Sequence, residues 1–316
     1  MGNINVREYL TNLDSEIDRK YGSLYIPKRK ILKNPFQRVK FYDMDRAVGQ
    51  MTYKDIPMYY KVFKANSFNA KTRACRIACE VFLSRLYDAL GVNSIIYYPV
   101  STNLVEEENK IVVSQDISKI DGLDIKDPRE DIPDDINSLI YNIHHQTIKQ
   151  LIDAKSKMEE NGTLNINQGF FDDFLKMLIL DKIFMQTDRH SNFFLAGNEL
   201  GETVIAYDNE RNGFNKFVET QYEDFKTFLK SDYGYSSWFY IGAIGEGYPQ
   251  IFDEIKRLHN TEQLNHIIDD IIKRLKEIDI RQLLSDACCQ CGYSAPQFIK
   301  DQISFVVDNA QENLCK

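Results

Sequence analysis

The stretch TDRHSNFFLAGN (187–198), followed after four residues by TVIAYDNERNG (203–213), decides how this chain folds. It is a polar interruption directly after FFDDFLKMLILDKIFM (170–185), a segment that is apolar nearly all round. Such a segment predicts a helix buried in a core. Within the interruption, FFLA and TVIAY predict a small β-hairpin closed by glycine and asparagine. Polar groups held between a buried helix and a hairpin are well placed to form a site.

The interruption concentrates acidic and amide side chains. Its polar members are Asp188, Arg189, His190, Asn192, Asp208 and Asn209. Carboxylate and amide oxygens are hard ligands of the kind that Mg²⁺ prefers. Phosphoryl transfer needs one carboxylate to orient or deprotonate the accepting hydroxyl, and further oxygens to hold metal on the phosphates. The same residues are also consistent with a simpler interpretation, in which Asp188 caps a turn and Asp208 with Asn209 forms another.

The first third of the chain reads as strands around one helix. Short β-branched or aromatic runs predict strands at 23–27, 38–42, 57–65, 94–100 and 110–114. Apolar residues at helical spacing predict a helix from Lys71 to Leu90, and Gly91 is placed to end it as a C′ glycine.

The remainder is expected to be mainly helical. Residues 121–135 are acidic and contain two prolines, which predicts a linker or loop. An amphipathic helix is expected at 136–152, and Asn260 is a plausible N-cap for a further helix. The predicted class is therefore α+β, with a strand-rich N-lobe at 1–118 and a helical lobe at 119–316.

TDRHSNFFLAGN followed by AYDNERNG resembles the catalytic and metal-binding loops of the HipA-like kinases. That atypical Ser/Thr kinase group includes the small CtkA-type kinases, and phosphoinositide kinases use a similar D-R-H-x-x-N loop. The resemblance implies a two-lobed protein-kinase-like fold. It implies that Asp188 is the catalytic base and that Asn192 and Asp208 bind metal. Arg189 and His190 join Asp188 as catalytic-loop candidates, which support the loop or line the substrate side.

The resemblance extends upstream to the expected nucleotide site. VFKAN (62–66) is similar to a family strand whose lysine holds the phosphates, which makes Lys64 the candidate. Lys61 is the rival, three residues earlier and on the opposite strand face. CEVFLSRLYDALGV (79–92) resembles the family helix whose glutamate pairs with that lysine, here Glu80. The segment KIVVSQDIS (110–118) falls where the hinge between lobes is expected, so backbone groups near Ser114 and Asp116 would meet adenine.

By this resemblance the chain is expected to use ATP and Mg²⁺ to phosphorylate a hydroxyl, with a protein Ser or Thr as the favoured acceptor. A lipid or small-molecule hydroxyl is the alternative within the enzyme class. Asn192 stands four residues after Asp188, whereas the family usually places this asparagine five residues on. That spacing keeps open a non-catalytic nucleotide-binding or partner-binding module. A helical regulatory protein with no nucleotide site is the third possibility.

Composition sets outer limits on these hypotheses. The formal net charge of −8 argues against general affinity for nucleic acid or anionic membrane. The polar start MGNINVREYL has no apolar signal-peptide core, so a cytoplasmic protein without membrane insertion is expected, with secretion as an effector left open. Six cysteines include a CCxC cluster at 288–291, which reads as free thiols rather than a zinc site because no second ligand pair lies nearby.

Overall fold

The computed structural model describes residues 24–25, 38–43, 46–53, 56–63, 70–101, 110–119, 123–126, 168–186, 189, 192–198, 201–219, 223–230, 261–290 and 297–310. The strands are β1 (Leu24–Tyr25), β2 (Arg38–Asp43), β3 (Arg46–Tyr53), β4 (Ile56–Phe63), β5 (Tyr98–Ser101), β6 (Lys110–Gln115), β7 (Asp124–Lys126), β8 (Phe193–Asn198) and β9 (Gly201–Ala206). The helices are α3 (Ala70–Ala89), the 3₁₀ turn η1 (Ile117–Lys119), α6 (Gln168–Ile183), α7 (Gly213–Glu219), α8 (Phe225–Lys230), α11 (Thr261–Glu277), α12 (Ile280–Gln290) and α13 (Gln297–Asp308). The predicted α+β class is confirmed.

The N-terminal strands form a six-stranded sheet in the order β1-β5-β6-β4-β3-β2. Its neighbours pair antiparallel except β1, which runs parallel to β5. Strand β3 was not predicted, although it pairs with β4 along its whole length. Gly49 of β3 lies opposite Tyr60, and a Cβ at position 49 would come within 2.4 Å of the tyrosine ring. A side chain at position 49 would displace the Tyr60 ring, and the glycine that stands there interrupts the β pattern of the strand.

Helix α3 matches the predicted helix closely. Its residues are buried along almost the whole length, and Gly91 follows it with a positive φ of 94°. The Gly91 N–H donates to the Asp88 carbonyl at 3.0 Å, and the Val92 N–H donates to the Tyr87 carbonyl at 2.9 Å. These are the two hydrogen bonds of a Schellman cap. The predicted C′ glycine thus ends α3 as expected.

The buried helix and the hairpin on either side of the polar interruption are also present. Helix α6 ends in a turn where Met185 has a φ of 56° and the Gln186 N–H donates to the Asp181 carbonyl at 2.8 Å. β8 and β9 form the predicted hairpin, and β7 adds a third strand to it. Residues 121–135 were predicted to form a linker or loop, and strand β7, which lies within them, corrects that prediction. Its three residues, Asp-Ile-Lys, are too few and too polar to show a strand pattern.

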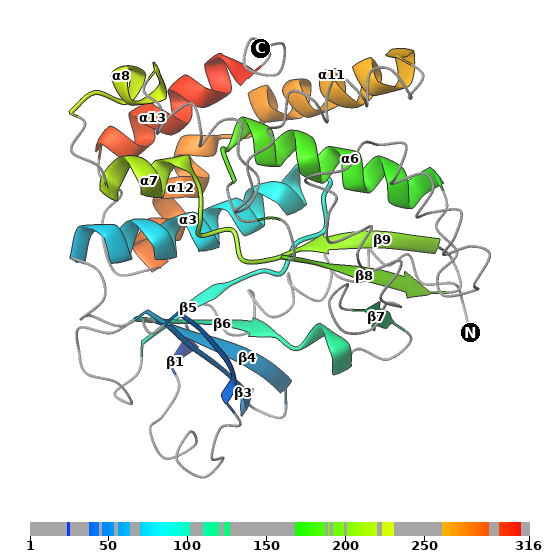
Figure 1. The fold of residues 1–316 in the computed structure, drawn as a ribbon, viewed down its shortest axis with the longest axis vertical. Coiled ribbons are helices and arrows are strands. Elements are labelled where there is room, and N and C mark those ends of the chain that lie inside the picture. The colour runs from blue at the N-terminus through cyan, green and yellow to red at the C-terminus, as the bar shows by residue number, and fades with distance from the viewer. Residues whose placement is uncertain are drawn as a thin grey trace.

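One hydrophobic core unites these elements. Helix α3 lies between the six-stranded sheet and the C-terminal helices in Figure 1, and it contacts β5 on one side and α7 and α12 on the other. Helix α6 packs on β9 and on α11. The predicted helix at 136–152 and the proposed cap Asn260 lie outside the described residues. In the described part of the chain, no helix has both the length and the apolar character needed to cross a bilayer.

Candidate active site

The β8–β9 hairpin brings two polar loops together. Because the strands are antiparallel, Phe193 pairs with Ala206, and the residues just before β8 meet those just after β9. The Tyr207 N–H donates to the Asn192 carbonyl at 3.1 Å, which continues the pairing into the loops. The described residues Arg189 and Asn192, which precede β8, therefore lie beside the segment Tyr207-Asp208-Asn209 that follows β9.

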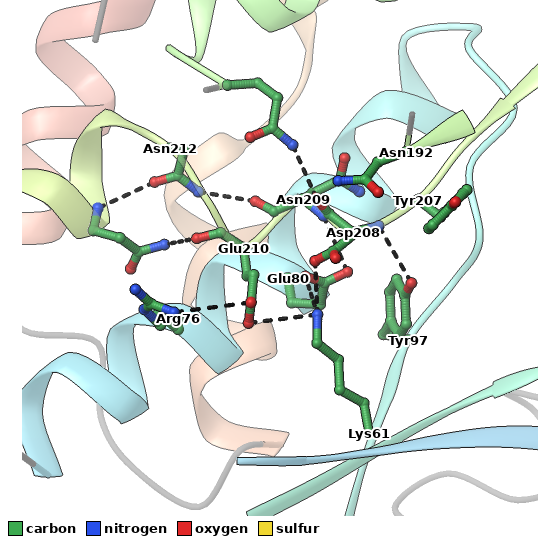
Figure 2. Close-up of polar contacts among 12 residues, drawn as sticks. Lys61, Arg76, Glu80, Tyr97, Asn192, Tyr207, Asp208, Asn209, Glu210 and Asn212 are labelled. Atoms are coloured by element: carbon green, nitrogen blue, oxygen red, sulfur yellow. Dashed lines mark hydrogen bonds and ion pairs between the residues drawn. The ribbon is translucent and has the colours of Figure 1, made fainter. Parts of the chain in front are cut away.

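A lysine from the six-stranded sheet reaches this loop. Lys61 of β4 places its Nζ 2.7 Å from Asp208 Oδ1, 3.6 Å from Glu80 Oε2 and 3.5 Å from Glu210 Oε2. We call these four residues the Lys61 cluster. Figure 2 shows the lysine rising from its strand toward three carboxylates that come from α3 and from the loop after β9. The lysine side chain is 9% exposed and the Asp208 side chain 19%.

The lysine–glutamate pair was predicted for Lys64, and the structure corrects this to Lys61. Successive side chains of a strand alternate between its faces. Lys61 shares a face with Phe63, which belongs to the core around α3, and its Nζ lies 5.3 Å from the Phe63 ring centre. Lys64 lies outside the described residues, after the end of β4. Among the described residues, the lysine that contacts Glu80 is therefore Lys61, on the strand face that meets the core.

Glu80 links the lysine to the loop. It is fully buried on α3, and its Oε1 accepts a hydrogen bond from the Asn209 N–H at 3.1 Å while Oε2 faces Lys61. One carboxylate therefore fixes both the ammonium group and the backbone next to Asp208. Glu80 was predicted to pair with Lys64, and the lysine that it contacts among the described residues is Lys61.

Asp208 adopts a left-handed backbone conformation with a φ of 55°. Aspartate tolerates this region better than most residues, but the surroundings must hold it there. Its carbonyl accepts a hydrogen bond from Gln186 Nε2 at 3.0 Å, and its N–H donates to the Tyr97 hydroxyl oxygen at 3.3 Å. Burial raises the pKa of Tyr97 well above its usual value, and the charges of Glu80 and Asp208 add to the rise. The tyrosine therefore stays protonated beside the carboxylates.

Arg189 lies at the centre of a second buried network. Its guanidinium is fully buried and donates to both carboxylate oxygens of Asp181 on α6. It also donates to the carbonyls of Asn192 and Tyr207, at 2.6 and 2.7 Å, and to Asn209 Oδ1 at 2.6 Å. Tyr87 of α3 donates its hydroxyl to Asp181 Oδ1 at 2.8 Å. We call Arg189, Asp181, Tyr87 and Asn209 the Arg189 cluster.

The Arg189 cluster joins α3, α6 and both polar loops. Burial raises the pKa of Asp181, and the guanidinium and the tyrosine hydroxyl limit that rise. Arg189 was grouped with the catalytic-loop candidates on the basis of sequence. Its complete burial and its protein partners favour the alternative in that hypothesis, support of the loop.

The remaining predicted site residues divide into two groups. Asn192 is 7% exposed, and Figure 2 shows it beside the Asp208-Asn209 turn, a position consistent with a metal ligand. Asp188 and His190 lie outside the described residues, so their roles stay predictions.

At the predicted hinge, the side chains of Ser114 and Asp116 are both buried. Ser114 of β6 pairs with Tyr59 of β4. The Asp116 N–H donates to the Pro57 carbonyl at 2.9 Å, and its Oδ1 accepts from the Ser118 N–H at 3.1 Å. Asp116 thus starts the turn η1 with its own polar groups engaged, and any backbone contact to adenine falls to its neighbours.

The acidic members of the Lys61 cluster can hold a cation. Glu80, Asp208 and Glu210 each offer one carboxylate oxygen, and these oxygens lie within 4.8 Å of one another. Such hard oxygen donors fit Mg²⁺, which takes one or two carboxylates together with phosphate oxygens and water. Glu210 was not predicted. The only signal in the sequence was a second acidic residue two positions after Asp208, which alone does not distinguish a site from a solvated loop.

Comparison with known proteins agrees with this geometry at the level of the fold. No protein-family profile matches the chain, and no curated protein sequence matches it. Among solved structures, the proinflammatory kinase CtkA of Helicobacter pylori is similar, with a TM-score of 0.52 and 12% sequence identity. The match covers 89% of this chain and 92% of that one. The chain therefore has a kinase-like α+β fold, with an antiparallel N-terminal sheet and C-terminal helices, as the sequence predicted.

Proposed function

We propose that this protein is an ATP- and Mg²⁺-dependent phosphotransferase that transfers the γ-phosphoryl group to a hydroxyl, with a protein Ser or Thr as the favoured acceptor. The observation that carries the proposal is the Lys61 cluster. A buried lysine on the sheet lies against a buried helix glutamate and against the aspartate after the hairpin. This is the set of groups that phosphoryl transfer needs for phosphate binding and metal binding.

Each residue has a distinct task in this proposal. Lys61, held by Glu80, binds the α- and β-phosphate oxygens and stabilises their charge in a site from which water is largely excluded. Asp208 and Asn192 hold Mg²⁺, which when bound neutralises charge on the phosphates. Asp188 orients the acceptor hydroxyl and accepts its proton. The acceptor oxygen then bonds to the γ-phosphorus as the bond from that phosphorus to the β–γ bridging oxygen breaks, and ADP leaves.

Radiolabel transfer from [γ-³²P]ATP to a generic protein acceptor or to the chain itself tests the chemistry, and a thermal-shift assay with ATP and Mg²⁺ tests binding. Wild-type protein should be stabilised by ATP with Mg²⁺ and should transfer label, whereas Asp188→Ala should bind but not transfer.

The other outcomes select among the alternatives. Binding with no Asp188-dependent transfer to protein, lipid or small-molecule hydroxyls would identify a non-catalytic nucleotide-binding module. The four-residue spacing between Asp188 and Asn192 is the observation that favours this second candidate. Absence of any nucleotide-dependent stabilisation would contradict the proposal altogether and favour a regulatory protein without a nucleotide site.

A further inference from the structure

Gln186 is a buried residue that was not among the site residues predicted from the sequence. It lies three residues after the end of α6, and its side chain is fully buried. Its Nε2 donates a hydrogen bond to the backbone carbonyl of Asp208 at 3.0 Å, across 22 residues of sequence. Gln186 therefore acts on the backbone of a proposed metal ligand from outside the proposed ligand set.

The backbone of Gln186 is itself fixed at several points. Its N–H donates to the Asp181 carbonyl at 2.8 Å, in the turn where Met185 has a φ of 56°. Gln186 also forms an isolated antiparallel bridge with Asn212, and the next N–H, that of Gly213, donates to the Met185 carbonyl at 2.9 Å. The turn is thus tied to α6 on one side and to the start of α7 on the other. A buried side chain on such a turn has little freedom, so the position of its amide group is set in advance.

Asp208 has a backbone conformation that needs this support. Its φ of 55° lies in the left-handed region, which a residue other than glycine keeps only where its surroundings hold it. Its N–H donates to the Tyr97 hydroxyl oxygen at 3.3 Å, a contact that Figure 2 shows, and Gln186 holds its carbonyl. The bond from Gln186 has the usual length of an N–H···O hydrogen bond, whereas the bond to Tyr97 is longer. Because φ and ψ set the direction of the Cα–Cβ bond, holding these peptide groups fixes where the carboxylate points.

We infer that Gln186 is a positioning residue that directs the Asp208 carboxylate toward the divalent cation bound with the nucleotide. The inference rests on the proposed function and deepens it, since it names a residue that controls a metal ligand through the backbone. Without the amide donor, the left-handed conformation of Asp208 is less populated. The metal-dependent part of nucleotide binding then weakens, whereas binding of the metal-free nucleotide, which does not use Asp208 as a ligand, is unchanged.

Isothermal titration of the full chain with AMP-PNP, a non-hydrolysable ATP analogue, tests this directly. The dissociation constant is measured once in excess Mg²⁺ and once in EDTA, and the metal-dependence ratio is the EDTA value divided by the Mg²⁺ value. We expect wild-type protein to show a ratio of at least about 10, because Mg²⁺ joins carboxylate and phosphate oxygens. Gln186→Met, which keeps the length of the side chain but removes the donor, should lower that ratio about fivefold and leave the EDTA value within about twofold of wild type.

Two further variants separate positioning from general stability. Gln302→Met makes the same substitution at another buried glutamine, 4% exposed on α13, and should leave the ratio unchanged even where it lowers stability. Tyr97→Phe removes the acceptor of the longer bond to the Asp208 N–H and should lower the ratio by no more than about twofold. A larger fall in Tyr97→Phe than in Gln186→Met would overturn the assignment of this control to the glutamine.

Amide hydrogen exchange of the nucleotide-free protein gives a readout that does not depend on any ligand. The Asn209 N–H, which donates to Glu80 Oε1 at 3.1 Å, follows the carbonyl that Gln186 holds. In Gln186→Met this amide should exchange about fivefold faster, with the amides of α3 unchanged. Faster exchange throughout α3 as well would show a general structural role and contradict the inference.

The outcomes distinguish the inference from the function on which it rests. An unchanged ratio in Gln186→Met, or equal weakening with and without metal, overturns the positioning role and leaves nucleotide binding intact. A wild-type ratio near one also overturns it, whatever the folding of the variants. No binding of AMP-PNP by wild-type protein in Mg²⁺ overturns the proposed nucleotide site and this inference together. Unfolding midpoints of each unliganded variant identify those that are folded and can be compared.

Discussion

The Lys61 cluster and the Arg189 cluster lie on either side of the same turn, at Asp208-Asn209, but they differ in burial. The Arg189 guanidinium binds the Asp181 carboxylate, both groups are fully buried, and the guanidinium also donates to carbonyl and amide oxygens. The Lys61 ammonium faces three carboxylates, and the Asp208 side chain is 19% exposed. A fully buried network stabilises one arrangement, whereas a partly exposed cluster of charged groups is suited to bind a charged ligand.

The largest effect should come from breaking the fully buried Arg189 cluster. Arg189→Met leaves the buried Asp181 carboxylate without its cation, which should lower the free energy of unfolding by about 3–5 kcal/mol. Urea denaturation monitored by circular dichroism measures the loss. Arg274→Met is the matched control, because it breaks an exposed pair with Asp270 and should cost no more than about 0.5 kcal/mol. Equal effects of the two substitutions would contradict the distinction between the clusters.

Removing the lysine of the Lys61 cluster should affect ligand binding and activity before stability. Lys61→Met should abolish the thermal stabilisation by ATP with Mg²⁺ and lower phosphoryl transfer about 100-fold or more, because a preorganised donor to the phosphates is lost. Lys64→Met, three residues along the chain, should stay within about twofold of wild type in both assays. The reverse result would restore the original sequence-based choice of Lys64.

A smaller effect is expected from Tyr87, the tyrosine of the Arg189 cluster. Tyr87→Phe removes the hydroxyl that donates to Asp181 Oδ1 at 2.8 Å and should lower the free energy of unfolding by about 1.5 kcal/mol. In a double-mutant cycle with Arg189→Met, the two losses should differ from simple addition by at least about 0.5 kcal/mol, since both residues bind the same carboxylate. Strict additivity would show that the cluster does not act as a unit.

The smallest effect concerns an exposed carboxylate that serves as a reference. Asp224 accepts hydrogen bonds from the Thr227 N–H and hydroxyl, each at 2.8 Å, at the start of α8, and these bonds hold its pKa below the usual value. A lowered pKa in the folded state contributes stability above the unfolded pKa, and that stability is lost as pH falls through the folded pKa. The stability difference between wild type and Asp224→Asn should therefore shrink on acidification. A pH series of urea unfolding curves measures it, and a difference independent of pH would contradict the assigned hydrogen bonds.

Elements with strong local signals were predictable from sequence. Helix α3 has an apolar pattern along its length and a glycine at its C′ position, and the β8–β9 hairpin follows a helix that is apolar nearly all round. The kinase-like arrangement was reached through the Asp-Arg-His loop and the Tyr-Asp that follows β9. Those signals are local, so one sequence is sufficient to detect them.

The features that were missed depend on tertiary contacts. Strand β3 contains Gly49, which lies against the Tyr60 ring of the neighbouring strand β4. The choice between Lys61 and Lys64 depends on which face of β4 meets α3, and the place of Glu210 in the Lys61 cluster depends on Lys61 approaching from another element. The burial of Arg189 also depends on tertiary contacts, and it is this burial that favours a supporting role over a catalytic one. None of these distances is encoded in the residue pattern around the position itself.

A crystal structure with AMP-PNP and Mg²⁺ tests phosphate binding by Lys61 most directly. The expected result is an α- or β-phosphate oxygen within about 3.2 Å of Lys61 Nζ, with the Lys61–Glu80 pair retained and Asp208 turned from the ammonium group toward the metal. Phosphates bound elsewhere, with the 2.7 Å contact between Lys61 and Asp208 intact, would contradict the proposed site.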